Sequence, residues 1–209
     1  MTITLGIDIG QKRDPTAVAV VETEWREVEG RAEAHYMVRH LERIRLNTAY
    51  PEVAGRIARI TDQVRARTGE NPTVFVDATG VGTPVVDLLR ERVHSGEVVA
   101  VWFTAGDQRT ESWEGDHLRV SLGKSHMVSR LQVLLGKGRL HLPRTLEAEA
   151  LSRELLDFEL RVDQRGYERS GAFRTGTHDD LACALGLATQ LDPVQRPQPR
   201  TSLRPSPVG

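Results

Sequence analysis

Leu5-Gly6-Ile7-Asp8-Ile9-Gly10 sets a carboxylate, that of Asp8, inside an apolar run of the kind that forms a buried strand. A second apolar run, Val74-Phe75-Val76, ends in the same way at Asp77. A carboxylate among buried strand residues is costly unless it is paired or binds a cation. Two such strands predict a divalent-metal site assembled from distant parts of the chain.

A third acidic motif stands near the end of the chain, in Thr177-His178-Asp179-Asp180-Leu181. It opens a helical pattern in which Leu181, Ala184, Leu185 and Ala188 follow the i, i+3, i+4, i+7 spacing. Packing this stripe on the sheet would bring the helix start, with its two acids, to the same spot as Asp8 and Asp77.

The remaining patterns predict an α/β protein with a mixed central sheet flanked by helices. Three antiparallel strands, a helix, a strand, a helix and another strand come first, and the second half is expected to be mainly helical. In this topology the strand ending at Asp77 lies beside the strand of Asp8, about 4.8 Å away. The predicted strands are 3–9, 16–24, 34–46, 73–76, 98–103 and 139–142, and the helices include 51–69, 125–135 and segments around 85–89 and 151–158. A β-hairpin at 159–175, with its tip at 163–166, precedes the last helix.

The composition of the chain indicates its domain organisation and its cellular location. The 209 residues, of which 39% are apolar and 27% charged, predict one globular domain over 1–192 and a proline-rich disordered tail over 193–209. No apolar stretch approaches the roughly 18 residues of a membrane span. A single cysteine, Cys183, excludes an intrachain disulfide, and these features together predict an intracellular, cytoplasmic protein. The net charge of -1 leaves the partner open.

Carboxylates without histidine or cysteine clusters favour hard, oxygen-preferring cations. Two Mg²⁺ or Mn²⁺ ions about 3.5–4 Å apart can activate a water and stabilise the leaving oxygen in phosphodiester hydrolysis. In this interpretation Asp8 bridges both ions, Asp77 holds one and Asp180 the other, with Asp179 in support.

Each motif also has a structural alternative. Asp8 can accept hydrogen bonds from turn amides at a strand end, and Asp77 can begin an Asx turn into residues 78–80. Thr177 and Asp180 have the spacing of a capping box. The segment Gly80-Val81-Gly82-Thr83-Pro84 lacks the Lys-Ser/Thr of a phosphate loop, which favours a tight strand-to-helix turn.

Several basic residues are candidates for contacting a phosphate backbone. Lys124 precedes a helix, and His178 adjoins the acids. Others lie in or beside the predicted hairpin, which could also act as a gate over the acids. The full set of candidates is Lys124, Arg165, Arg169, Arg174 and His178.

Taken together, these segments resemble the nuclease domain of bacteriophage terminase large subunits, which belong to the ribonuclease-H-like superfamily. The resemblance covers Gly6-Ile7-Asp8 with Asp14-Pro15-Thr16-Ala17, and Val76-Asp77-Ala78-Thr79-Gly80-Val81-Gly82. It continues through Gly123-Lys124-Ser125 and ends at Gly176-Thr177-His178-Asp179-Asp180-Leu181, its most specific match.

The resemblance implies a ribonuclease-H-like fold and metal-dependent cleavage of double-stranded DNA during genome packaging. By position, Asp8, Asp77 and Asp180 take the family's metal-binding acids and Asp179 the neighbouring one. It further implies a packaging ATPase domain, a small terminase and a portal as partners, in the cytoplasm of a host cell. The sequence departs from a whole terminase large subunit in having no Walker A motif.

Three other functions are compatible with parts of the pattern. A Holliday-junction resolvase carries similar acids on the same fold. An actin-like or sugar-kinase-type nucleotide-binding domain suits Gly6-Ile7-Asp8-Ile9-Gly10 but needs two domains and leaves Asp179 and Asp180 without a role. A non-catalytic docking module would bind no Mn²⁺.

Overall fold

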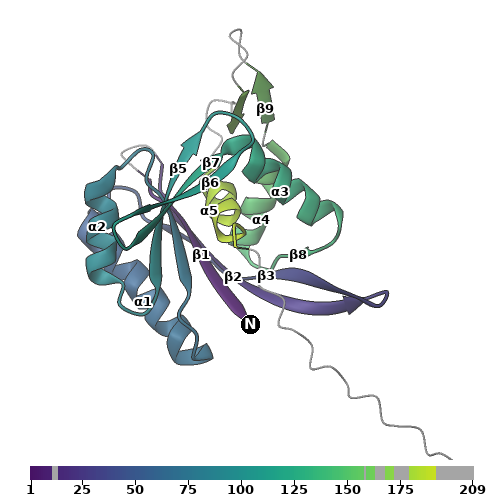
Figure 1. The fold of residues 1–209 in the computed structure, drawn as a ribbon, viewed down its shortest axis with the longest axis horizontal. Coiled ribbons are helices and arrows are strands. Elements are labelled where there is room, and N and C mark those ends of the chain that lie inside the picture. Colours follow the sequence, from purple (N-terminus) through teal and green to yellow (C-terminus); the bar gives the residue numbers. More distant parts are fainter. Residues whose placement is uncertain (11–13, 158, 163–167, 172–178, 192–209) are drawn as a thin grey trace, which may run out of the picture.

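The computed structural model describes residues 1–10, 14–157, 159–162, 168–171 and 179–191. A mixed eight-stranded sheet forms its centre, and helices cover both faces (Figure 1). The α/β class and the mixed sheet predicted from the sequence are confirmed. The predicted tail, 193–209, lies outside the described residues. Within those residues, no helix is both long enough and apolar enough to cross a membrane.

Three antiparallel strands begin the sheet: β1 (Thr2–Asp8), β2 (Thr16–Val28) and β3 (Arg31–Ile44). β2 and β3 run further than predicted, to a turn in which Glu29 and Gly30 have φ of 50° and 74°. The residues near this turn are polar and mostly exposed, so an apolar pattern does not mark them.

Parallel strands joined by helices extend the sheet on the other side of β1. The elements are α1 (Tyr50–Thr68), β4 (Thr73–Asp77), α2 (Thr83–Arg92) and β5 (Glu97–Thr104). α1 has Pro51 in its first turn and ends at Gly69 with φ of 75°, the left-handed C-cap that glycine favours. β4 pairs in parallel with β1 and with β5, as predicted for the strand that ends at Asp77.

A hairpin of β6 (Arg109–Glu114) and β7 (His117–Gly123), which was not predicted from the sequence, completes this edge of the sheet. β6 is almost wholly exposed, because it is the edge strand. Its sequence, Arg-Thr-Glu-Ser-Trp-Glu, lacks the apolar alternation by which half-buried strands are recognised. Gly115, with φ of 59°, allows the turn.

The last elements confirm the predicted order of helices and strands. They are α3 (Lys124–Gly136), β8 (Leu140–His141), α4 (Leu146–Asp157), β9 (Glu159–Val162), β10 (Glu168–Gly171) and α5 (Asp180–Ala188). β9 and β10 pair antiparallel, which is the predicted hairpin; its tip lies outside the described residues. The strand order of the large sheet is β6-β7-β5-β4-β1-β2-β3-β8.

Two helical layers enclose the sheet. α1 and α2 pack on one face through Val53, Ile57 and Leu89, and α3, α4 and α5 lie on the other (Figure 1). α5 was expected to bury one stripe, but all nine of its residues are buried. It lies against β1 and β2 with α3 and α4 beside it, so no side of it is left for solvent.

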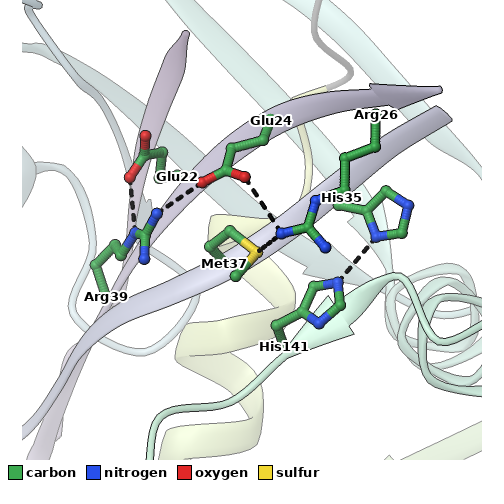
Figure 2. Close-up of polar contacts among 7 residues, drawn as sticks. All are labelled: Glu22, Glu24, Arg26, His35, Met37, Arg39 and His141. Carbon is green, nitrogen blue, oxygen red and sulfur yellow. Dashed lines mark hydrogen bonds and ion pairs between the residues drawn. The ribbon is translucent and has the colours of Figure 1, made fainter. Parts of the chain in front are cut away.

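The far edge of the sheet carries a polar cluster on β2, β3 and β8 (Figure 2). Arg39 donates to Glu22 and Glu24, each at 2.7 Å. His35 on β3 and His141 on β8 stack with their ring centroids 5.2 Å apart, and the His35 Nδ1 and His141 Nε2 atoms are 2.9 Å apart. Together with the parallel pairing, this contact joins the short β8 to the sheet.

Candidate metal centre

The three acidic motifs meet at one end of the sheet. Asp8 is the last residue of β1 and Asp77 the last of β4, and parallel neighbours end at the same edge. Asp179 is the N-cap of α5 and Asp180 its first residue. All four side chains line one cleft of about 910 Å³. The structure thus brings together residues 8, 77, 179 and 180 of the chain.

Glycine at position 6 lets α5 reach this place. A Cβ atom on Gly6 would lie 1.9 Å from the carbonyl oxygen of Ala184, so only glycine allows the helix to cross β1 this closely. The hydroxyl of Thr4 donates to the carbonyl of Ala188 along the same contact. The helix therefore starts directly beside the end of β1, where Asp8 lies.

Asp8 has three acidic neighbours in the cleft. Burial raises the pKa of its carboxyl group well above the usual value, and the charges of Asp77, Asp179 and Asp180 raise it further, while Lys124 opposes them. No turn amide in the described part of the chain donates to Asp8, in contrast to the structural alternative considered for it. The carboxylates have the oxygen donors that a divalent cation prefers, and a cation would relieve their repulsion. Among the described residues, however, no three acidic, histidine or cysteine side chains already lie close enough together to hold an ion.

Asp77 takes part in the turn that follows β4. Its Oδ1 accepts the Thr79 backbone N–H at 2.8 Å, the Asx turn expected as the structural alternative. The Thr79 hydroxyl accepts the Phe103 backbone N–H at 2.8 Å, which ties the turn to β5. The turn employs one of the two carboxylate oxygens and holds the side chain at the cleft, so structural and ligating roles are compatible.

Asp180 is bound by a residue that sequence reasoning missed, Arg43 of β3. Its Oδ2 and Oδ1 accept from the Nε and Nη2 of Arg43 at 2.7 and 3.3 Å. The same Nη2 donates to Glu154 of α4, another buried acid. Burial raises the pKa of Glu154 to about 7, although a hydrogen bond from the Ala182 backbone lowers it. The capping-box partner Thr177 lies outside the described residues, and the Asp180 carboxylate faces Arg43.

Neither new residue has a local sequence signal. Arg43 belongs to a strand rich in charges. Glu154 lies in a helix whose buried face is indicated by its apolar residues, of which Glu154 is not one. The contacts of Arg43 with Glu154 and with Asp180 span 111 and 137 residues.

The basic candidates have different outcomes. Lys124, the first residue of α3, lines the cleft, and its Nζ is 5.4 Å from the centroid of the Phe103 ring. Arg165, Arg174 and His178, and the side chain of Arg169, lie outside what the structure describes. The β3–α1 segment 45–50, which no motif singled out, also lines the cleft with exposed Arg45. Cys183, predicted to be a small core residue, is buried at the cleft wall.

No protein-family model and no curated protein matches the sequence. Solved structures of three terminase nucleases match 90% of the chain. The large terminase nuclease of the thermophilic phage G20c is 19% identical, with a TM-score of 0.60 over 80% of its length. The large terminase nuclease domain of Thermus phage P74-26 is 16% identical, with a TM-score of 0.54 over 77% of its length, and the human cytomegalovirus terminase nuclease domain is 16% identical, with a TM-score of 0.56 over 82% of its length. Other structures of the G20c nuclease hold cobalt or magnesium.

The sheet and helices therefore form a ribonuclease-H-like fold. More particularly, it is the fold of large terminase nuclease domains, as the sequence resemblance implied. At these identities the likeness is one of fold.

Proposed function

We propose that the chain is a metal-dependent endonuclease that cleaves double-stranded DNA, and that it acts as the nuclease part of a viral genome-packaging terminase. The observation that carries this proposal is the convergence of four carboxylates from β1, β4 and α5 in one cleft of a ribonuclease-H-like fold. The G20c nuclease, which has a similar fold, has been solved with bound cobalt and with bound magnesium, and this supports the choice of a divalent cation.

Asp8, Asp77, Asp179 and Asp180 would hold two Mg²⁺ or Mn²⁺ ions. When bound, such ions supply an activated water and charge stabilisation at the leaving oxygen. The chain's own contribution is to place the four acids around one cleft. Asp8 lies among the other three acids, whose charges add to the effect of burial in raising the pKa of its carboxyl group, so it would be a ligand of these ions.

Lys124 and Arg45 supply the positive charge that a phosphate backbone needs at an otherwise acidic cleft. Such contacts position a duplex without reading its sequence, so the cleavage is expected to be nonspecific and sensitive to salt. The packaging ATPase, small terminase and portal proteins are the partners this function requires, and the host cytoplasm is its place.

Cleavage of supercoiled plasmid with Mn²⁺, Mg²⁺ or EDTA tests the proposal. Asp8→Asn, Asp77→Asn and Asp180→Asn should each lower the Mn²⁺-dependent rate by more than about a hundredfold, the upper range for loss of an outer-shell partner. Asp62→Asn, an exposed acid on α1, is the matched control and should cleave like the wild type. The metal-free Asp8→Asn variant should melt at an equal or higher temperature, because its carboxylate repulsion is removed.

Each other outcome has a meaning. Wild-type activity in one of the three variants would remove that acid from the site. Faster cleavage of four-way junctions than of linear duplex would indicate a resolvase. Absence of both cleavage and Mn²⁺ binding in the wild type would indicate a docking module, and ATP binding by calorimetry a nucleotide-binding domain.

A further inference from the structure

Arg43 joins two buried acids that come from different helices. Its guanidinium takes both oxygens of Asp180, through Nε and Nη2, and Nη2 also donates to Glu154 Oε1. The Arg43 side chain is 31% exposed, whereas the Asp180 and Glu154 side chains are 3% and 7% exposed. A two-pronged arginine contact fixes the orientation of a carboxylate more tightly than a single hydrogen bond does.

Glu154 connects the same cluster to the backbone of α5. Its Oε2 accepts the backbone N–H of Ala182 at 2.9 Å. This N–H lies in the first turn of the helix, where no intrahelical acceptor exists. The N-cap residue, Asp179, makes no side-chain capping bond, so Glu154 does part of the work of a cap from another helix.

We propose that Arg43 and Glu154 are positioning residues of the metal centre. Arg43 holds the Asp180 carboxylate in one orientation, and Glu154 sets the first turn of α5, and with it Asp179, against Asp8 and Asp77. The proposal rests on the metal-dependent function proposed above. Partners of this kind typically change metal affinity by about 10- to 100-fold.

A positioning role and a purely electrostatic role of Arg43 predict opposite changes in Mn²⁺ affinity when the residue is replaced. A guanidinium beside a cation site repels the cation, so removal of its charge alone would strengthen Mn²⁺ binding. If the arginine orients Asp180, its removal weakens binding instead. A lysine retains the charge but not the rigid pair of donors. Arg43→Lys therefore changes the donor geometry at constant charge, whereas Arg43→Met removes both the donors and the charge.

Mn²⁺ affinity is measured by titration calorimetry on the whole chain, without DNA, after circular dichroism has shown that each variant is folded. Arg43→Lys and Arg43→Met should each bind Mn²⁺ about tenfold more weakly or worse. Arg56→Met is the matched control. Arg56 also places Nε and Nη2 on the two oxygens of a carboxylate, that of Glu42, and is 32% exposed, but it lies outside the cleft. The Arg56→Met variant should bind Mn²⁺ with the affinity of the wild type.

Glu154→Gln supplies a second measurement. A glutamine offers one oxygen acceptor in place of two, so it cannot serve both Arg43 and the Ala182 N–H. If Arg43 and Glu154 act as a unit, the Arg43→Lys/Glu154→Gln double variant should bind Mn²⁺ about as weakly as the worse single variant. Additive losses would show that the two residues act separately.

The outcomes separate this inference from the proposed function. If the wild type binds no Mn²⁺, or Asp8→Asn binds it equally well, the proposed function fails and the inference with it. If the wild type binds Mn²⁺ through Asp8 but Arg43→Lys binds it unchanged, or Arg43→Met more tightly, only the inference is overturned. Loss of folding in Arg43→Met leaves Arg43→Lys as the test, and loss of folding in both gives Arg43 a structural role alone.

Discussion

Two consecutive acids at the start of α5 have different surroundings. Asp179 is the half-buried N-cap residue, whereas Asp180 is almost wholly buried and bound by Arg43. A buried ion pair is weak support for stability in itself, but removal of one partner leaves a costly unpaired charge. The presence of such a pair beside a cleft is therefore better explained by what it holds in place.

At the same scale, Arg45 gives a prediction about DNA binding. Arg45 is exposed at the cleft and has no ion-pair partner among the described residues. Arg45→Glu and Lys124→Glu should each weaken duplex binding and lower its salt slope by about 0.9 for each phosphate that is no longer neutralised. Binding is measured by fluorescence anisotropy against salt, with Mn²⁺, in the uncleaving Asp8→Asn background.

Arg59→Glu, on the exposed surface of α1 outside the cleft, is the control for the change of net charge. An unchanged slope for Arg45→Glu would place the DNA path elsewhere, and Arg165, Arg169, Arg174 and His178 would be the next residues to examine.

At the scale of the element, the crossing of α5 over β1 decides whether the acids meet. Gly6→Ala would set a methyl group against the backbone of Ala184, which cannot move without displacing the helix. The free energy of unfolding should fall by about 3 kcal/mol, as in other overpacked cores, and Mn²⁺ binding should weaken. Urea denaturation and calorimetry measure the two effects.

Gly55→Ala is the control, because its new methyl group would meet only the tip of Arg59, at 3.6 Å. This change in the interior of α1 should stabilise the protein by about 0.5–1 kcal/mol. Equal stability of Gly6→Ala and the wild type would contradict the close crossing.

The contact between β3 and β8 predicts a dependence of stability on pH. Burial lowers the pKa of His35, and the charges of Arg26 and His141 beside it lower it further (Figure 2). The charge of Arg139 acts in the same direction, while Glu33 opposes it. The unfolded chain thus takes up the proton more readily than the folded one. The stability that the neutral ring provides is present above about pH 6.5, the ordinary histidine value, and is lost as pH falls through the lower folded-state pKa.

Thermal melts of the metal-free protein between pH 7.5 and 5.5 check this expectation. His35→Gln, which does not titrate, should show a smaller fall in melting temperature over that range. His94→Gln, an exposed histidine outside the pair, should show the same fall as the wild type. A fall of equal size in all three proteins would contradict a role for His35.

At the scale of the whole molecule, the packaging role proposed above would require the nuclease to stay idle during translocation. The β9–β10 hairpin precedes the acids of α5 in the chain and is the predicted gate. Shortening its tip at Gln164-Arg165-Gly166 should change the plasmid-cleavage rate and leave Mn²⁺ affinity unchanged. An unaltered rate, or a loss of metal binding, would rule the gate out.

Most of the fold could be predicted because its signals are local. Apolar runs ending in Asp8 and Asp77 mark strands, and Pro51 and Gly69 mark the ends of α1. The β6–β7 hairpin could not, because an exposed edge strand needs no apolar alternation. The burial of all sides of α5 could not either, because it depends on which elements lie beside it.

For the site, the sequence by itself determined which acids are available and that strands and a helix start carry them. Their meeting depends on backbone distances such as that between Gly6 and Ala184, which only the folded chain defines. The tertiary structure alone decided the partners of Asp180. Arg43 and Glu154 are ordinary surface-type residues in their own segments, and folding makes them neighbours across more than a hundred positions. Periodicity reports the environment of a residue within its element, whereas a side-chain pair between elements leaves no local pattern.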